Sequence, residues 1–372
     1  MKDILSENWI VHLDELSSEC PSDHVLFLGD IALARGVADK IEEFGYKYNL
    51  DAVYPDFQKK DLVVFNLECC LTERGEAWEP KPVLMNGKAE YLNIFPSDTN
   101  YSVNVANNHF LDLGELGAQD TLDHIYEQGM DCFGAIDNDL KSFQSTVSLP
   151  NTIISMLAYS PAAHPFICKA DVNVSYKMLS EMVLDIQLLK NTDELLIVSL
   201  HQGVEFCRYT DKKSRERAHA LIDAGAESVI CHHTHVIQGV EIYRGKAIFY
   251  GIGNFLIDID TKSMPNTKYS LGLEFLLQDN KIKQIKVTPY FINEKLQVEY
   301  LTGFDKERLH SEINWLSSFF TNPIFSMINY GLARYMWTKL HLRSLINMWQ
   351  RTGLRASIKY YNTRVWSKLF NR

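Results

Sequence analysis

Three histidines, His232, His233 and His235, lie within four positions in the stretch VICHHTHVIQG, residues 229–239. Imidazole rings are common ligands of divalent metal ions. If the chain is extended here, His233 and His235 point to the same side, and His232 faces away as a supporting residue. An HxH spacing by itself is more often structural than metal-binding. The interpretation as a metal site therefore depends on which other ligating groups the fold brings to these histidines.

Further ligating side chains stand at or near the ends of four other apolar runs. These runs read HVLFLGD, DLVVFNLE, YSVNVANNH and ELLIVSLHQG, and each predicts a buried β-strand. In α/β folds, the chemistry gathers at the carboxyl ends of the strands, where the loops converge. With the histidine pair included, the predicted ligands are Asp30, Glu68, Asn108, His201, His233 and His235. Such groups suit Mn²⁺, Fe²⁺ or Zn²⁺, and two ions need a carboxylate that bridges them.

The segments between these runs predict the elements that position the ligands. Helices are expected in GELGAQDTLDHIYEQG, SEMVLDIQLLKNT and DKKSRERAHALIDAG, the last with Gly225 as its C-cap. The first helix is expected to bury one face, made of Leu116, Thr121, Leu122 and Ile125. Two hairpins follow, with turns at residues 244–245 and 279–280. Strands that alternate with helices predict a layered α/β architecture.

Several motifs together carry a resemblance to a known family. The segments GDIALARGV, NLECCLT, VANNHFLDLGELG, SLHQGVEF and ALIDAGAESVICHHTHVIQGVEIYRGKAIFYGIGNF resemble the CapA-type capsule-synthesis family, which is related to the calcineurin-like metallophosphoesterases. The family is named for the synthesis of poly-γ-glutamate capsules. The resemblance covers residues 25–255 and implies an α/β fold: a layered metallophosphoesterase-like β-sandwich flanked by helices. The pattern of the C-terminal residues adds a helical C-terminal extension. We expect an N-terminal segment over 1–23, the family domain over 24–300 and a basic, aromatic-rich helical region over 301–372.

The resemblance also implies a role for each predicted ligand. Asp30 and His235 would bind the first metal ion, and Glu68 would stand where metallophosphoesterases place the bridging carboxylate, with Asn66 nearby. The second ion would be bound by Asn108, His201 and His233. His109 would lie over the reacting group as a general acid or as a residue that stabilises charge.

Four other positions are expected to support this site. Glu205 would act as a ligand, as an acid or base, or as a support for an imidazole. Arg35 would contact an anionic group of the substrate, although a plain surface arginine explains it as well. Asn254 is expected to line the substrate pocket, and both Asn254 and Asp112 are expected to organise loops.

Two positions depart from the phosphoesterase pattern. Ala32 stands where the usual first motif has a histidine, and Asn66 with Glu68 replaces the usual aspartate of the second motif. The first metal ion would therefore have fewer protein ligands. Either one or two divalent ions remain as alternatives.

Composition narrows the class of protein. The chain of 372 residues has a net charge of −10, which argues against a general nucleic-acid binder. Its seven cysteines include no CxxC pair, which favours a reducing compartment. The acidic N-terminus does not resemble a signal peptide, and no apolar run is long enough to cross a bilayer. We expect a cytoplasmic protein, with a peripheral location on the inner membrane face as a further option.

The C-terminal residues 313–372 contain nine Lys or Arg and no Asp or Glu, with many aromatic residues between them. One interpretation is a helical subdomain that docks on the acidic body through its aromatic face. The other is an amphipathic element that lies on an anionic membrane surface or binds a protein partner.

Two hypotheses about function remain. The first is a metal-dependent phosphoesterase-like hydrolase in capsule or cell-envelope polymer (polysaccharide) biosynthesis, with a phosphoester or an anionic envelope-polymer precursor as its substrate. The alternative is a non-catalytic or accessory component of a complex that synthesises or exports a capsular polymer such as poly-γ-glutamate. An independent ATP-driven ligase is disfavoured because the sequence has no GxxxxGK[ST] motif.

Overall fold

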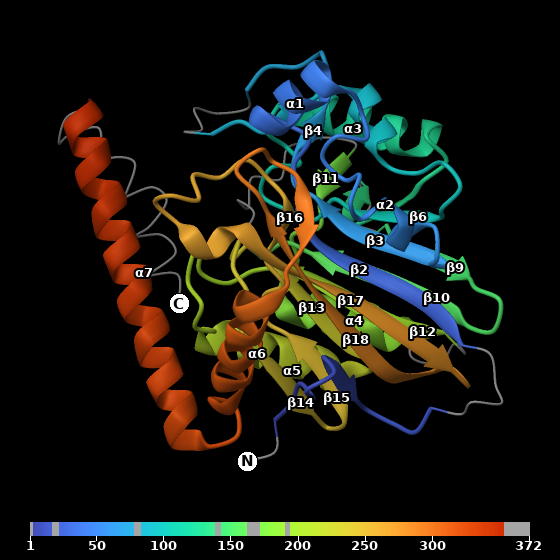
Figure 1. Ribbon diagram of the computed structural model, residues 1–372, viewed down its shortest axis with the longest axis vertical. Coiled ribbons are helices and arrows are strands. Elements are labelled where there is room, and N and C mark those ends of the chain that lie inside the picture. Colours follow the sequence, from blue (N-terminus) through green and yellow to red (C-terminus); the bar gives the residue numbers. More distant parts are fainter. Residues whose placement is uncertain are drawn as a thin grey trace.

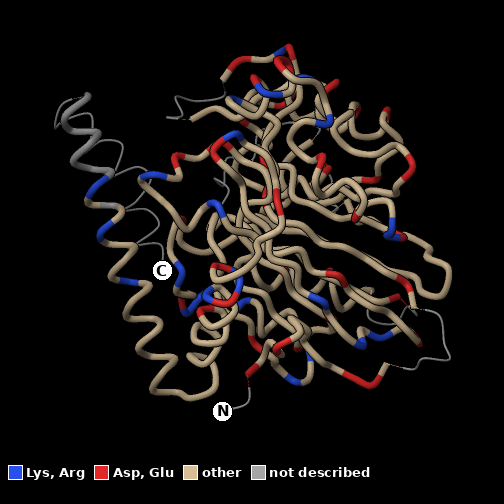
Figure 2. The backbone as a smooth tube through the Cα atoms, viewed as in Figure 1, with Lys and Arg blue, Asp and Glu red and all other residues tan. Residues whose placement is uncertain are grey.

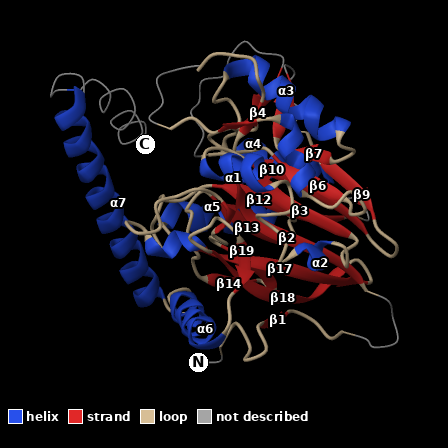
Figure 3. Cartoon of the chain, turned by 45° about the horizontal axis from the view of Figure 1, so that its top comes forward, coloured by secondary structure: helices blue, strands red, loops and turns tan. Residues whose placement is uncertain are grey.

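The computed structural model describes residues 3–16, 22–77, 83–137, 143–161, 172–189 and 194–352. Within these residues the chain forms two large β-sheets, which lie at the centre of the molecule with helices outside them (Figures 1 and 3). This is the layered α/β sandwich that the sequence predicts, and it has the predicted helical C-terminal extension.

The first sheet has nine strands, with β1-β18-β17-β2-β3-β6-β7 in spatial order, β16 beside β2 and β19 beside β18. Strands β16, β2, β3, β6 and β7 run parallel, whereas β17, β18, β1 and β19 pair antiparallel. The bounds are β1 (Ile10–His12), β2 (Asp23–Ile31), β3 (Leu62–Leu67), β6 (Tyr101–Asn104), β7 (Asp131–Phe133), β16 (Asn254–Leu256), β17 (Tyr269–Gln278), β18 (Lys281–Ile292) and β19 (Val298–Tyr300).

The second sheet has six strands in the order β14-β15-β13-β12-β10-β9. Strands β10, β12, β13 and β15 run parallel. The bounds are β9 (Ser145–Ser148), β10 (Ile153–Tyr159), β12 (Leu195–His201), β13 (Ser228–His232), β14 (Val240–Tyr243) and β15 (Lys246–Phe249). Two small pairs complete the strands: β4 (Cys70–Leu71) with β5 (Asn86–Gly87), and β8 (Ala135–Asp137) with β11 (Val172–Val174).

Helices lie around the two sheets. They are α1 (Gly36–Phe44), α2 (Tyr54–Phe57), α3 (Gly114–Glu127), α4 (Leu179–Leu189), α5 (Lys212–Ala224), α6 (Gly303–Ser318) and α7 (Pro323–Thr352), with 3-10 helices η1 (Ala89–Ile94) and η2 (Pro265–Lys268). Helices α1, α2 and α3 pack on the first sheet, and α4 and α5 pack on the second.

The layers follow from side chains that alternate along the strands. In β3, Leu62 and Val64 belong to the apolar core between the two sheets, whereas Val63 and Phe65 belong to the core beneath α1, α2 and α3. Strand β12 alternates in the same way between the central core and the core beneath α4 and α5. Both faces of these strands are buried, which is why each reads as a continuous apolar run.

Several local predictions are confirmed and one is wrong. The predicted hairpins are β14–β15 and β17–β18, with Asp279 and Asn280 at positive φ in the second turn. Helix α5 ends before Gly225, at φ 137°, as predicted. In α3, however, Leu116 is 56% exposed and does not join the buried face. At about 100° per residue it lies about 180° around the helix from the buried Ile125.

The third predicted strand is shorter than expected. Strand β6 ends at Asn104, although the apolar pattern extends it to His109. The Asn104 side-chain oxygen accepts a hydrogen bond from the backbone N–H of Ala106 at 2.8 Å, and this local bond turns the chain. Asn108 and His109 are therefore presented by the loop that follows β6.

The C-terminal region consists of α6 and the long helix α7, drawn in red in Figure 1, as far as Thr352. The predicted tail continues over residues 353–372, which lie outside the described residues. The predicted domain boundaries at 24 and 300 stay predictions. Strand β1 lies before the first boundary and pairs with β18. Among the described residues, none of the helices is both long and apolar enough to span a membrane.

Candidate metal centre

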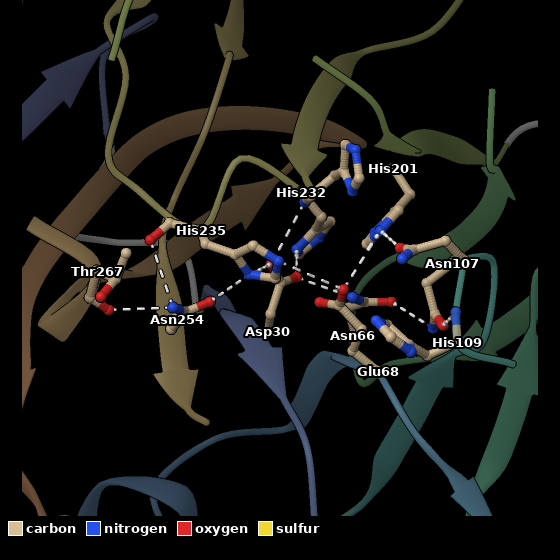
Figure 4. A network of polar contacts seen from close by, with 12 residues as sticks. Asp30, Asn66, Glu68, Asn107, His109, His201, His232, His235, Asn254 and Thr267 are labelled. Atoms are coloured by element: carbon tan, nitrogen blue, oxygen red, sulfur yellow. Dashed lines mark hydrogen bonds and ion pairs between the residues drawn. The ribbon is translucent and has the colours of Figure 1, made fainter. Parts of the chain in front are cut away.

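The predicted ligands meet where the parallel strands of both sheets end. Asp30 is the second-last residue of β2, Glu68 directly follows β3, and His201 is the last residue of β12. Parallel strands deliver their carboxyl ends to one edge, and here the edges of the two sheets face each other. Figure 4 shows the resulting side chains pointing toward one another.

Two groups of potential ligands share one carboxylate. Asp30, Glu68 and His235 form the first group, and Glu68, His201 and His233 form the second; within each group the ligand atoms lie within 4.8 Å of one another. The Oε1 atom of Glu68 lies 3.6 Å from Nε2 of His201 and 3.7 Å from Nε2 of His235. All five residues are buried. The structure thus brings these residues together in the two groups expected from the resemblance.

The donor set fits a bound cation. Glu68 is 1% exposed, and neither of its oxygens has a hydrogen-bond partner among the described residues. The Nδ1 atom of His201 is likewise buried without a partner. Leaving a buried carboxylate unsatisfied costs free energy, so such a group is normally paired with a cation or bound to a metal. The unsatisfied oxygens of Glu68 are therefore placed as metal ligands would be.

Burial and neighbouring charges shift the pKa values of three residues in the cluster. Burial raises the pKa of Glu68 well above its usual value, and the nearby charges of Asp30 and Glu205 raise it further. Burial lowers the pKa of His201, and the neighbouring His233 lowers it further. For Asp30, burial alone would raise the pKa, but the hydrogen bond from His232 and its charge outweigh burial and lower it.

Asp30 is held by three neighbours. The Asn66 side-chain amide donates to Oδ1 at 2.8 Å, and Nδ1 of His232 lies 2.8 Å from the same oxygen. The backbone N–H of His233 donates to Oδ2 at 3.3 Å. His232 therefore supports the site directly, whereas the extended-chain prediction had its ring facing away. Supporting contacts of this kind fix the orientation of a ligating carboxylate.

The histidine loop is not extended, contrary to that prediction. Strand β13 ends at His232, and His233 and His235 have φ values of 82° and 56°. Both imidazoles still reach the cluster because the chain turns around the carboxylates. The Nδ1 atom of His235 is 2.8 Å from Oδ1 of Asn254, whose amide also donates to the Thr267 carbonyl at 3.0 Å. Asn254 thus orients His235, beyond the pocket-lining role predicted for it.

The loop after β6 contributes two further predicted residues. Oδ1 of Asn108 lies 2.6 Å from Nε2 of His201, which places Asn108 beside the second ligand group. His109 is oriented by Asp112, whose Oδ2 lies 2.7 Å from Nδ1 of the ring. Because Nδ1 is engaged, Nε2 is the atom at which His109 could transfer a proton.

Asn107, for which no role is predicted from the sequence, joins the two halves of the site through hydrogen bonds. Asn107 donates to the Leu67 carbonyl at 2.8 Å and to Oδ1 of Asn66 at 3.2 Å, and it accepts from the backbone N–H of His109 at 3.0 Å. Since Asn66 also donates to Asp30, these hydrogen bonds run from Asp30 to the His109 loop. The sequence does contain a signal for this contact: Asn66 in NLE and Asn107 in ANNH are polar residues within otherwise apolar runs.

Arg35, Glu205 and Ala32 lie outside the two ligand groups. Arg35 has φ 56° and pairs with Asp258 at 3.7 Å. Glu205 is exposed, near enough for its charge to raise the pKa of Glu68. Ala32 is buried in the apolar core beneath α1, so this position contributes no ligand. The first group therefore has Asp30 and His235 as its unshared ligands.

Comparison with known proteins shows the family of this chain. Residues 24–259 match the family described as bacterial capsule synthesis protein PGA_cap. The chain belongs to this family. The PGA biosynthesis protein CapA of Bacillus subtilis (strain 168) is 30% identical over 289 residues, 73% of this chain and 73% of that protein. The capsule biosynthesis protein CapA of Bacillus anthracis is 27% identical over 77% of this chain and 71% of that protein.

Similarity to solved structures is much weaker. The crystal structure of TT1561 of Thermus thermophilus covers 71% of this chain and 98% of its own, with a TM-score of 0.39 and 10% sequence identity. A superposition this loose says nothing about ligands or activity. Every residue of the two ligand groups lies within the matched range 24–259, whereas α6 and α7 follow it.

Proposed function

We propose that this member of the PGA_cap family is a metal-dependent hydrolase of the phosphoester type that acts in capsule or cell-envelope polymer biosynthesis. The observation that carries the proposal is the buried, unsatisfied carboxylate of Glu68, shared by two groups of ligating side chains. A shared carboxylate between two such groups is the arrangement that a pair of divalent ions requires.

Five side chains and one amide would hold Mn, Fe or Zn. Asp30 and His235 would hold one ion, His201, His233 and Asn108 the other, and Glu68 would lie between them. When bound, such ions supply positive charge to phosphate oxygens and lower the pKa of a water molecule. One ion in place of two stays an alternative, because Ala32 adds no ligand to the first group.

The protein itself would contribute a general acid, His109, held in a fixed orientation. His109 would donate the proton at Nε2 to the leaving oxygen of the phosphoester. Asp112 holds the ring through Nδ1, and it also accepts the backbone N–H of Met85 at 2.8 Å, which fixes the carboxylate itself. In a buried site, these prearranged groups act without reorganising solvent. Exposed Arg35 would contact an anionic group of the substrate at the edge of the site, and exposed Glu205 would act there as an acid or base.

The biological setting is inferred from the relatives. Two of them are named for PGA or capsule biosynthesis, so the substrate proposed here is a phosphoester or an anionic precursor of an envelope polymer. A cytoplasmic location, with a peripheral position on the inner membrane face as a further option, is part of this proposal.

The test is metal analysis of the purified protein together with hydrolysis of bis(p-nitrophenyl) phosphate and p-nitrophenyl phosphate. We expect at least one equivalent of transition metal and activity on one of the two esters. His233→Ala should lower both metal content and activity, the latter by about 100-fold or more. His124→Ala, on the outer surface of α3, is the matched control. Less than one equivalent of metal, with wild-type behaviour of His233→Ala, would overturn the proposal.

A second candidate function has support from other relatives. Two proteins of Mycobacterium tuberculosis that are 29% identical over 54% of this chain are named probable polyglutamine synthesis accessory proteins. In that role the same centre would be structural or would bind an anionic polymer. Stoichiometric metal without hydrolysis of either ester would favour the accessory role over the hydrolase.

A further inference from the structure

The C-terminal helix α7 is fixed to the body along one face. Arg215 of α5 donates to Oγ of Ser326 at 2.8 Å and to the hydroxyl of Tyr330 at 3.1 Å. Asn329 donates to the Thr210 carbonyl at 2.8 Å. Ser326, Asn329 and Ala333 are buried. The first turns of α7 are therefore docked in a defined orientation, and this orientation decides which side chains face outward.

The opposite face of α7 carries an apolar stripe. It consists of Ile324, Met327, Ile328, Tyr335 and Leu342, which are 47% to 71% exposed. Their spacings of three, four and seven residues place them on one side of a helix. Tyr335 lies about 200° around the helix from the buried Ala333, since each residue advances by about 100°. The stripe thus points directly away from the body.

Basic residues flank this stripe. Arg334 lies about 80° to one side of the line from Ile324 to Leu342, and Lys339 and Arg343 lie about 60° and 100° to the other. Figure 2 shows Lys and Arg on the part of α7 that is coloured by charge, and no acidic residue there. From residue 313 to 372 the sequence has no Asp or Glu at all, although the whole chain has a net charge of −10.

We propose that this outer face of α7 docks the protein on an anionic lipid surface. An exposed apolar stripe between two rows of cations is suited to a bilayer interface: the apolar side chains enter the acyl boundary, and the cations reach the phosphate groups. The helix would lie in the plane of the surface, since α7 is not apolar enough to span it. The inference does not depend on the proposed hydrolase activity.

A second copy of the chain fits this face less well. Pairing two α7 stripes would bring Arg334, Lys339 and Arg343 of both copies together, without an acidic residue on either helix to offset them. An anionic lipid surface supplies the complementary charge and the apolar phase together. The same conflict disfavours a basic protein partner.

The experiment is flotation of the full-length protein with vesicles of phosphatidylcholine alone and of phosphatidylcholine with phosphatidylglycerol. We expect binding to the anionic vesicles only, and weaker binding at high salt because the charges are screened. Arg334→Gln/Lys339→Gln/Arg343→Gln should weaken binding by roughly 100-fold, about fivefold for each charge. Ile328→Gln/Leu342→Gln should weaken it about tenfold.

Two control variants test whether the loss of any exposed cation or apolar side chain weakens vesicle binding. Lys295→Gln removes an exposed cation in the turn between β18 and β19, and Leu188→Gln removes a side chain of α4 that is 78% exposed. Both should float like the wild type. Equal binding to both kinds of vesicle, no binding to anionic vesicles, or unchanged binding of both α7 variants would each overturn the proposal. So would sedimentation showing that Ile328→Gln/Leu342→Gln converts a dimer to a monomer, because a second copy would then cover the stripe.

Discussion

At the residue scale, the candidate site depends on Glu68. Its carboxylate lies between Asp30 with His235 and His201 with His233, and its oxygens have no hydrogen-bond partner among the described residues. In a protein without metal this arrangement is unfavourable, since the buried carboxyl group must either carry an uncompensated charge or take up a proton. The same arrangement favours a cation. A change at Glu68 that makes the metal-free protein more stable is therefore expected to weaken metal binding.

Replacing Glu68 by glutamine should separate these two effects. Glu68→Gln keeps the shape but removes an ionisable group that costs free energy at neutral pH, whether it is buried with its charge or takes up a proton. The metal-free variant should therefore be more stable than the wild type by about 1–2 kcal/mol. Its metal content should fall below that of the wild type. Thermal unfolding in EDTA and elemental analysis measure the two quantities, with the exposed Glu90→Gln as control. A lower melting temperature of the metal-free variant would contradict this account.

Asp112 is predicted to act through His109. Asp112→Asn should leave the metal content unchanged but reduce kcat by about 10²–10³-fold, because the imidazole loses the carboxylate that sets its tautomer and stabilises its protonated form. The pH dependence of kcat should also shift, which a purely structural role would not produce. Steady-state kinetics across pH with metal analysis test this, and an unchanged profile with wild-type kcat would rule it out.

At the element scale, close backbone contact keeps Asp30 in place. Strand β2 runs beside β16, and a Cβ on Gly29 would lie 2.1 Å from the carbonyl oxygen of Gly253. The same carbonyl accepts the backbone N–H of Asp30 at 3.1 Å. The absence of a side chain at Gly29 thus lets the loop before β16 close against the end of β2. That loop also leads to Asn254, which orients His235.

Gly29→Ala should therefore destabilise the protein by about 3 kcal/mol and lower its metal content, because the backbone must move apart where Asp30 is held. Chemical denaturation and elemental analysis give both values. Gly331→Ala is the control: its Cβ meets nothing within 4 Å, and it lies within α7. That variant should be neutral or slightly more stable, by up to about 1 kcal/mol. Equal stability of the two variants would refute the role of this contact.

At the scale of the whole molecule, one ionic cluster joins the C-terminal helices to the second sheet. The Nη2 group of Arg215 pairs with Glu241 of β14 at 2.6 Å and donates to the Phe320 carbonyl at 3.1 Å, and its Nη1 group donates to Ser326 and Tyr330 of α7. Tyr250 and His219 also contact Glu241, at 2.6 Å and 2.9 Å. Burial alone would raise the pKa of Glu241, but the hydrogen bonds from His219, Arg215 and Tyr250 lower it to about 2.

This cluster predicts acid sensitivity. Because the folded-state pKa of Glu241 lies below the usual 4.5, its contribution to stability is present above pH 4.5 and is lost as the pH falls toward 2. Glu241→Gln should lack this contribution, roughly 2–3 kcal/mol at neutral pH. The stability difference between wild type and variant, measured by denaturation from pH 7 to pH 3, should therefore shrink at low pH. A difference that stays constant would contradict the assignment.

The sequence alone determined much of this protein. Strands that are buried on both faces leave continuous apolar runs, so the strands and the candidate ligands near their ends could be predicted without a structure. The family resemblance then supplied the grouping of the ligands about Glu68. The lack of acidic residues after position 312 marked the C-terminal region as distinct. These features are local, or are carried by motifs, and do not require knowledge of how distant segments pack.

Only the tertiary structure decided how the parts meet. His232 bonds to Asp30, 202 residues away in sequence, and Asn107, in the loop after β6, bonds to Asn66 of the neighbouring strand β3. The positive φ values at His233 and His235 replaced the expected extended chain. The outward direction of the α7 stripe depends on the Arg215 anchor. Each is a long-range contact or a turn imposed by packing, and neither composition nor periodicity records which distant surfaces come together.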